Sequence, residues 1–248
     1  MDNSLYEMIF KRKSFHLFRN TGETKITEDE LNDIKYYINK LEPLYPDIKT
    51  EIKIVKDGTT CKRGQEYCIL FYSEHKDGYL QNIGYIGEQL DLYLVSKDIG
   101  SLWFGIGKVE EKELDGLEYV IMIAIKKVDS SDKFRKDMFK SKRKDLNEIW
   151  TSPGYLDIAN IVRFAPSACN SQPWFVEGDE KEIKVYRKSS RRGIMPKAAV
   201  KFYNQIDIGI FICFLDLCFA KNMIKYNRMM VTENDSDNLI NLNAIYKF

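Results

Sequence analysis

Two long apolar segments that begin 125 residues apart share a pattern that constrains the fold more than any other feature of the sequence. IGYIGEQLDL (83–92) and IGIFICFLDL (208–217) have Ile, Gly, Leu, Asp and Leu at matching positions. The shorter segments EIKIV (51–55) and EIKVY (182–186) correspond in the same order at a slightly different offset. Two matches in one order predict a divergent internal duplication, with a central helix in each half. The alternative is a pair of unrelated amphipathic helices and two generic strands.

Capping residues and apolar spacing predict two longer helices in the first half. Thr27, followed three residues later by Glu30, is typical of a capping box and predicts a helix over 27–41. Apolar residues at helical spacing predict a second helix over 82–100, in which Gly100 is the expected C-cap.

Shorter elements surround these helices. A short helix is expected over 5–10, before the basic cluster KRKS. Dense apolar runs predict strands at 51–55, 66–72 and 118–125. A basic stretch at 133–145 then leads to a break at SPG (152–154), where the second half is expected to begin.

The composition indicates a globular protein, because hydrophobic residues make up 44% of the 248 residues. A net charge of +1 argues against nucleic acid or a membrane surface as a partner. The most apolar run, 206–220, carries Asp207 and Asp216, which favours a buried helix over a membrane span.

The N-terminus and the cysteines bear on the compartment. The first residues contain no apolar region of the kind found in secretory signals. The five cysteines are an odd count and include no C-x-x-C pair. We therefore expect a reduced, cytoplasmic protein without a structural zinc site.

Two cations, a hydroxyl and an imidazole occur together in RKSFH (12–16). Cations supply charge to a phosphate and a serine donates a hydrogen bond to it, so this segment is a candidate phosphate site. Short basic clusters are also common on solvated surfaces, and the residues alone leave both interpretations open.

The segment APSACNSQPW (165–174) carries a different set of side chains. Pro166 and Pro173 stiffen the backbone, while Asn170 and Gln172 offer donors and acceptors for a flat polar ring edge. The alternative is a loop that leads into a strand and contains a structural tryptophan.

Taken together, these segments resemble the FMN-dependent nitroreductase family. RKSFHLF (12–18) resembles the family's N-terminal R-R-S-x-R-x-F signature, and 165–174 resembles its A-P-S-x-x-N-x-Q-P-W signature at nearly every position. The helix at 82–100 with GSLWFG (100–105) is similar to the family's central helix and the G-x-x-x-W-x-G that follows it. SKRKDL (141–146) resembles its phosphate-binding arginine segment.

The order of the motifs departs from that family. Its ordinary members are homodimers, and each FMN is bound by the first motif of one subunit and the second motif of the other. Here the first motif lies in the half 1–149 and the second in the half 150–248, and each half lacks the motif that the other keeps. The resemblance therefore implies an α+β nitroreductase-like fold, a fused pseudo-dimer with one FMN site that is complete within a monomer.

The resemblance assigns cofactor-binding roles to residues of both halves. The FMN phosphate would be held by Arg12, Ser14 and Arg143. The ring and ribityl chain would be contacted by Pro166, Ser167, Ala168 and Asn170, with Gln172 supporting their loop. The other edge of the ring would be lined by Trp103, Phe104 and Gly105, and Lys62 or Arg63 would also reach the flavin.

His16 occupies a position where the family has Arg or Lys, near the flavin atoms that become negative on reduction. A permanent cation there favours reduction, whereas a histidine is only partly charged at neutral pH. Either His16 replaces that cation, or it fills space and Lys13 or Lys62 supplies the charge.

The resemblance implies that NAD(P)H reduces the flavin at N5 and that a small oxidised acceptor, such as a nitro compound or a quinone, then reoxidises it. The cofactor performs this chemistry, so no catalytic residue and no metal ligand are assigned. Two other classes remain open: a flavin-binding sensor or carrier without efficient turnover, and a globular protein that has kept the fold and lost the flavin.

Overall fold

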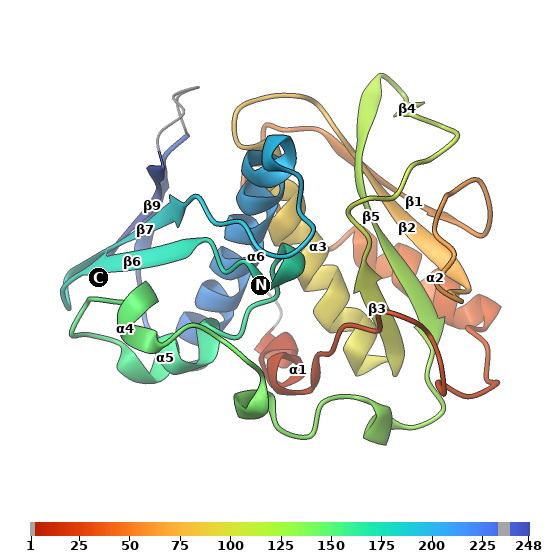
Figure 1. The fold of residues 1–248 in the computed structure, drawn as a ribbon, viewed down its shortest axis with the longest axis horizontal. Coiled ribbons are helices and arrows are strands. Elements are labelled where there is room, and N and C mark those ends of the chain that lie inside the picture. The colour runs from red at the N-terminus through yellow and green to blue at the C-terminus, as the bar shows by residue number, and fades with distance from the viewer. Residues whose placement is uncertain (1–2, 233–238) are drawn as a thin grey trace. The chain divides into compact units, whose positions relative to one another are not determined.

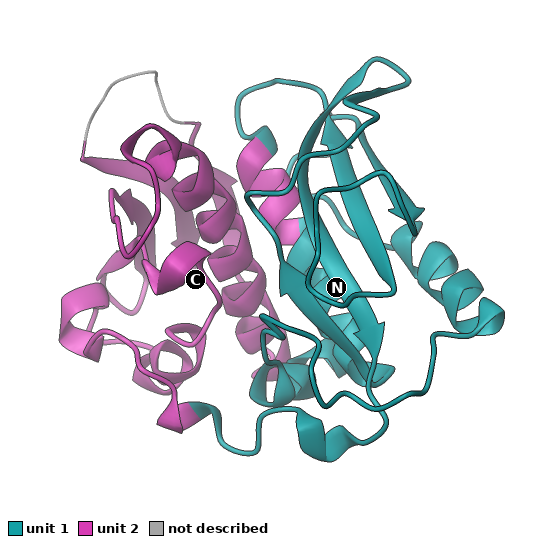
Figure 2. Cartoon of the chain, turned by 45° about the vertical axis from the view of Figure 1, so that its right-hand side comes forward, with its two compact units in different colours: residues 1–79, 86–138 teal, residues 80–85, 139–248 magenta. Residues whose placement is uncertain are grey.

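The computed structural model describes residues 3–232 and 239–248, and the chain divides into two compact units (Figure 2). Unit 1 consists of the chain up to residue 79 together with 86–138, and unit 2 consists of 80–85 together with 139–248. One helix, α3 (Tyr79–Ser96), therefore contributes residues to both units. The boundary expected between residues 149 and 150 concerns the origin of the halves, and it stays a prediction.

Unit 1 is built on an antiparallel sheet with the strand order β1-β2-β5-β3, and the short β4 pairs with β5 (Figure 1). The strands are β1 (Thr50–Val55), β2 (Tyr67–Ser73), β3 (Ile99–Trp103), β4 (Glu113–Leu114) and β5 (Leu117–Lys127). Its α-helices are α1 (Tyr6–Lys11), α2 (Glu28–Ile38) and most of α3. The predicted strands and the short N-terminal helix are confirmed.

The capping box at the start of α2 is confirmed. The Thr27 hydroxyl accepts the backbone N–H of Glu30 at 3.2 Å, and the Glu30 carboxylate accepts the backbone N–H of Thr27 at 2.9 Å. The helix ends at Ile38, three residues earlier than expected, because the Asn39 side chain donates to the carbonyl of Lys35 at 3.1 Å and closes the last turn.

The expected end of α3 is wrong. The helix stops at Ser96, and Asp98 adopts a left-handed backbone conformation with φ of 53°. Gly100 is no C-cap, because it lies within β3 and pairs with Lys126 of β5. Asp residues tolerate the left-handed region, so the reversal occurs before the glycine.

Unit 2 contains a second antiparallel sheet with the strand order β6-β7-β9-β8. The strands are β6 (Trp174–Gly178), β7 (Glu182–Lys188), β8 (Asn227–Met230) and β9 (Ile240–Lys247). Its α-helices are α4 (Leu146–Ile149), α5 (Leu156–Val162), α6 (Val200–Lys221) and the first residues of α3.

The helix α6 is the core of unit 2. By length and composition it could cross a membrane, but 83% of its most apolar window is buried inside the fold. The ring of Phe211 stacks on Trp174 of β6 at 5.0 Å. The expectation of a buried helix is confirmed.

The two sheets have the same topology. In each, the strands follow the order first, second, last, third, and the central helix lies between the second and third strands in sequence. Both ladders between the second and last strands also shift register, at Phe71/Tyr72 in unit 1 and at Val185/Tyr186 in unit 2. Bulges of this kind are built features and not defects. The sequence match of 51–55 with 182–186 does not join equivalent strands and is wrong. Residues 51–55 lie in the first strand of their sheet, whereas 182–186 lie in the second strand of theirs.

The matching glycines of the two central helices make reciprocal contacts within unit 2. A Cβ atom at Gly84 would lie 2.9 Å from the carbonyl carbon of Ile206, and one at Gly209 would lie 2.8 Å from the carbonyl carbon of Gln81. Positions 81 and 206 are 125 residues apart, as are 84 and 209. Each glycine therefore faces the residue that lies three positions before the other glycine.

Gly84→Ala and Gly209→Ala should each destabilise the fold. Alanine is the better helix former by about 1 kcal/mol, but overpacking against a backbone carbonyl costs about 1–3 kcal/mol and this clash cannot be relieved without parting the helices. Urea unfolding measures the difference, with Ser96→Ala at the exposed end of α3 as the control. Greater stability in either glycine variant would contradict the close helix contact.

Candidate functional site

Asp91 of α3 joins the first sequence motif to the sheet of unit 1. Arg12, directly after α1, donates from Nε to Asp91 Oδ2 at 2.9 Å. Trp103 Nε1 donates to the same oxygen at 3.1 Å, and the Ser101 hydroxyl donates to the other. Arg12 is only 5% exposed and Asp91 is fully buried, so this ion pair is an internal one.

Glu88, one turn before Asp91 on α3, is a buried carboxyl of a different kind. Its Oε1 lies 3.6 Å from Arg12 Nε, yet neither of its oxygens has a hydrogen-bond partner among the described residues. Burial, together with the charge of Asp91, raises the pKa of Glu88 well above its usual range. A raised pKa favours the protonated, uncharged form of Glu88, in which it attracts Arg12 less than Asp91 does.

Arg135 adds a second guanidinium to this cluster. Its backbone N–H donates to the carbonyl of Lys11 at 2.9 Å, which holds it next to the first motif. Burial and the neighbouring charge of Arg12 lower the pKa of Arg135 to about 10. Asp91 pairs with Arg12, and Arg135 forms no ion pair with a carboxylate of the described residues, which is a favourable electrostatic condition for binding an anion.

The first motif also opens on a cavity of about 590 Å³ within unit 1. Ser14 bridges to Ser101 of β3, and Phe15 N–H donates to the Ser101 carbonyl at 2.9 Å, so the motif runs along the sheet edge. The cavity is lined mainly by basic and polar side chains, among them Lys13, Ser14, His16, Arg19, Lys133 and Lys136. Predicted residues Lys13, Ser14 and His16 are thus brought together.

The predicted residues Trp103, Phe104 and Gly105, at the end of β3 and just after it, differ in their surroundings. Trp103 is fixed by Asp91 and stacks on Phe71 at 6.1 Å. Phe104 is buried in the hydrophobic cluster of unit 1, with the Arg63 guanidinium 5.4 Å above its ring, whereas Gly105 is half-buried. The role of these residues at a ring edge stays a prediction.

The second motif forms a strained loop in unit 2. Cys169, Asn170 and Gln172 have φ values of 52°, 55° and 50°, so three non-glycine residues of a four-residue stretch are left-handed. Each such residue costs free energy and persists only where its surroundings impose it, commonly at a binding site.

Asp207 of α6 imposes that conformation. Its carboxylate accepts the backbone N–H of Ala168 at 2.9 Å and the hydroxyl of Ser171 at 3.2 Å. Burial raises the pKa of Asp207 to about 7, against the opposing effect of these hydrogen bonds. Gln172 N–H donates to Ser167 Oγ at 3.0 Å, which tightens the turn.

The basic segment 141–146 lies beside this loop. Asn170 Nδ2 donates to the carbonyl of Lys142 at 3.1 Å, and the Gln172 side chain accepts the backbone N–H of Lys144 at 2.8 Å. Arg143 donates to the backbone carbonyls of Lys142 and Phe164, both at 2.9 Å. The side chains of Gln172 and Arg143 thus hold the loop against the segment 141–146. The cofactor-binding roles assigned to both residues stay predictions. Pro166, Ser167 and Ala168 are half-buried on the loop.

Four residues at these sites were missed by sequence reasoning: Asp91, Glu88, Arg135 and Asp207. Asp91 and Asp207 had a usable signal, since a carboxylate inside an apolar helix needs a partner. Arg135 had none, because it is one of several cations in an unpatterned basic stretch.

The fold is that of a nitroreductase. A crystal structure of a putative nitroreductase from Thermotoga maritima is similar with a TM-score of 0.64 and 18% identity, covering 98% of this chain and 93% of that one. At that identity the likeness shows the fold alone. A putative NADH oxidase from Clostridium acetobutylicum gives a TM-score of 0.39 and 15% identity, over 57% of this chain and 96% of that one.

The sequence profile of one family matches residues 4–218. The chain belongs to that family, which is described as Putative TM nitroreductase, and its relatives are nitroreductase-like oxidoreductases. None of the curated proteins matches this chain.

Stability should report the titration of Asp207. Its pKa of about 7 in the folded chain exceeds the ordinary value of 3.8, so the folded state binds the extra proton and the unfolding free energy falls as pH rises from about 4 to about 7. Asp207→Asn removes this group. Urea unfolding at several pH values should show that the free energy of unfolding of the variant rises relative to that of the wild type between about pH 4 and pH 7. A constant difference would show that Asp207 ionises normally.

Proposed function

We propose that this protein is an FMN-dependent oxidoreductase that takes hydride from NAD(P)H and reduces a small oxidised acceptor such as a nitro compound or a quinone. The observation that carries the proposal is the guanidinium of Arg135, which lies beside Arg12 and has no carboxylate partner among the described residues, next to a basic cavity lined by Lys13 and Ser14. Family membership gives the class of reaction, and this cluster supports the phosphate of FMN as the anion.

The donor chemistry fits a flavin phosphate. The proposal assigns the phosphate to Arg135, Ser14 and the remaining donors of Arg12, because guanidinium and hydroxyl groups form charge-assisted hydrogen bonds to phosphate oxygens. The raised pKa of Glu88 favours this role, because its protonated form would not cancel the charge that attracts the anion.

The loop at 165–174 is assigned to the flavin ring. Its left-handed residues and its support by Asp207 hold backbone groups in place before a ligand arrives, which reduces the entropy cost of binding. FMN, when bound, accepts hydride at N5 and passes it on. The chain orients both reactants, and His16, Lys13 or Lys62 would compensate the negative charge of the reduced ring.

We further propose that the two halves arose by duplication and share one FMN within a monomer. The common strand order, the common bulge and the reciprocal glycine contacts support the duplication. The single site rests on the distribution of the two motifs. The five free cysteines support the proposal that the protein is cytoplasmic. We propose no nucleic acid or membrane partner.

FMN should be present at one molecule per chain. Flavin released by denaturation is quantified against protein, and light scattering gives the oligomeric state of the loaded chain. Two flavins per chain would contradict the shared site, and a chain that binds none would contradict the cofactor. Anaerobic NADPH or NADH should bleach the flavin spectrum, whereas a carrier without turnover would stay oxidised.

Arg135→Ala should weaken FMN binding by about one to two orders of magnitude, since a charge-assisted hydrogen bond contributes about 1.5–3 kcal/mol and a tenfold change is about 1.4 kcal/mol. Riboflavin, which lacks the phosphate, should bind unchanged. Asn170→Ala should weaken both ligands alike, and Lys112→Ala, at an exposed cation, should affect neither.

Fluorescence titration with both flavins decides the assignment. An equal loss of riboflavin affinity in Arg135→Ala would show that this residue does not bind the phosphate. Arg12→Ala is a poorer test, because it leaves buried Asp91 without its cation, a change that costs about 3–5 kcal/mol of stability.

A further inference from the structure

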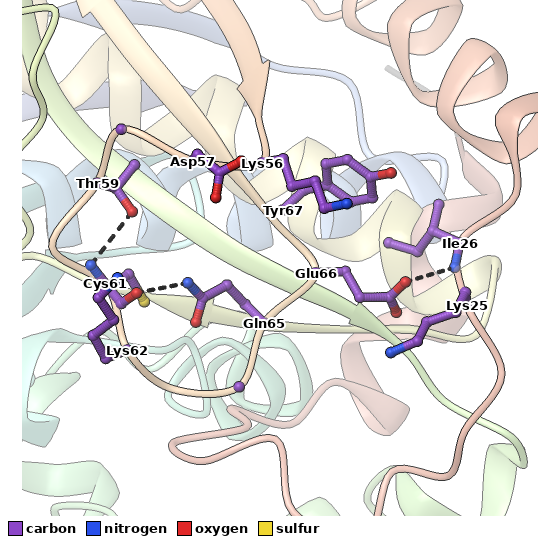
Figure 3. A pocket seen from close by; sticks show the side chains of 12 residues that line it. Lys25, Ile26, Lys56, Asp57, Thr59, Cys61, Lys62, Gln65, Glu66 and Tyr67 are labelled. Atoms are coloured by element: carbon purple, nitrogen blue, oxygen red, sulfur yellow. Dashed lines mark hydrogen bonds between the residues drawn. The ribbon is translucent and has the colours of Figure 1, made fainter.

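A second cavity of about 590 Å³ lies in unit 1 and shares no lining residue with the first. It is bordered by the loop between β1 and β2, residues 56–66, and by the segment at Lys25 and Ile26 (Figure 3). Three lysines line it: Lys25, Lys56 and Lys62. Cys61, on the same loop, forms part of its wall.

The Cys61 thiol faces a second thiol. Cys68 lies on β2, where it pairs with Val55 and Ala124, and both cysteines are 1% exposed. Thr59 connects them, because its hydroxyl accepts the backbone N–H of Cys61 at 3.3 Å and lies 3.6 Å from the sulfur of Cys68. Both cysteines belong to the same hydrophobic cluster of unit 1, and each perturbs the pKa of the other.

The pair is electronically asymmetric. The hydrogen bond from Cys61 outweighs burial and, with that from Thr59, lowers the pKa of Cys68 to about 7. The same hydrogen bond, together with burial, raises the pKa of the Cys61 thiol. A thiolate beside a thiol is the arrangement in which one sulfur attacks an oxidant and the other resolves the product.

We propose that Cys61 and Cys68 form a reversible disulfide, with a small hydroperoxide as the oxidant that enters through this lysine-lined cavity. The Cys68 sulfur attacks one peroxide oxygen, the O–O bond breaks, and a sulfenic acid forms. The Cys61 sulfur then attacks the Cys68 sulfur and displaces the hydroxyl. In sum, two thiols and one hydrogen peroxide give one disulfide and two water molecules, which take up both thiol protons.

The loop that carries Cys61 is tied to functional parts of unit 1. Phe18 N–H, at the end of the first motif, donates to the carbonyl of Arg63 at 3.0 Å, and the Arg63 guanidinium lies over Phe104. A disulfide would fasten this loop to β2 covalently. The proposal does not depend on a bound flavin.

The test uses the full-length chain with Cys169→Ser, which removes the exposed cysteine. It is treated with a small excess of hydrogen peroxide, unfolded, alkylated with N-ethylmaleimide and mapped by peptide mass spectrometry. We expect alkylation to be lost at Cys61 and Cys68 and a linked peptide pair lighter by two hydrogen atoms. Dithiothreitol should restore both thiols.

Two further variants locate the chemistry. With Cys61→Ser, Cys68 should stop at the sulfenic acid and be captured by dimedone, with no linked pair. With Cys218→Ser, at an equally buried cysteine of α6, the linked pair should persist. The proposal is overturned if Cys61 and Cys68 stay alkylated at a dose that oxidises free cysteine in the same tube, or if either links to Cys213 or Cys218 instead.

Discussion

The buried carboxylate of Asp91 is the interaction on which the rest of unit 1 depends. An isolated charge in that position would be prohibitively costly, so the chain must supply donors: a guanidinium from the end of α1, and an indole and a hydroxyl from β3. Satisfying this one group places the first motif along the sheet edge. Asp91 also pairs with Arg12, so the neighbouring Arg135 is the guanidinium that could bind an anion.

Unit 2 repeats this solution with different side chains. Asp216 stands at the position of α6 that matches Asp91, and it accepts hydrogen bonds from Tyr85 at 2.7 Å and Tyr246 at 2.8 Å and pairs with Arg228. In both units the carboxylate on the central helix accepts hydrogen bonds from the third strand, from Trp103 and Ser101 of β3 in one and from Arg228 of β8 in the other. The buried carboxylate thus stands at matching positions of the two central helices, with different partners in each unit.

The elements with strong local signals could be predicted from the sequence. The Thr27 capping box, the apolar strands and the buried helix at 206–220 each follow from side chains close together in the chain. The end of α3 could not, because an aspartate in a left-handed conformation leaves little trace in the sequence. At the candidate site, the motifs located the loop at 165–174 but not its support by Asp207, nor the charge of Arg135, since both depend on partners far away in the chain. A sequence pattern does not show which residues, far apart in the chain, will form hydrogen bonds or ion pairs with one another.

The division of α3 between the two units has a consequence for cooperativity. Residues 80–85 are packed with one unit while the helix continues without a break into the other. Its backbone hydrogen bonds run from each turn to the next, so fraying that starts in one unit propagates directly into the other. We therefore expect the unfolding of the two units to be coupled through this helix. A fragment ending at residue 138 would keep a helix whose first turns have lost their surroundings.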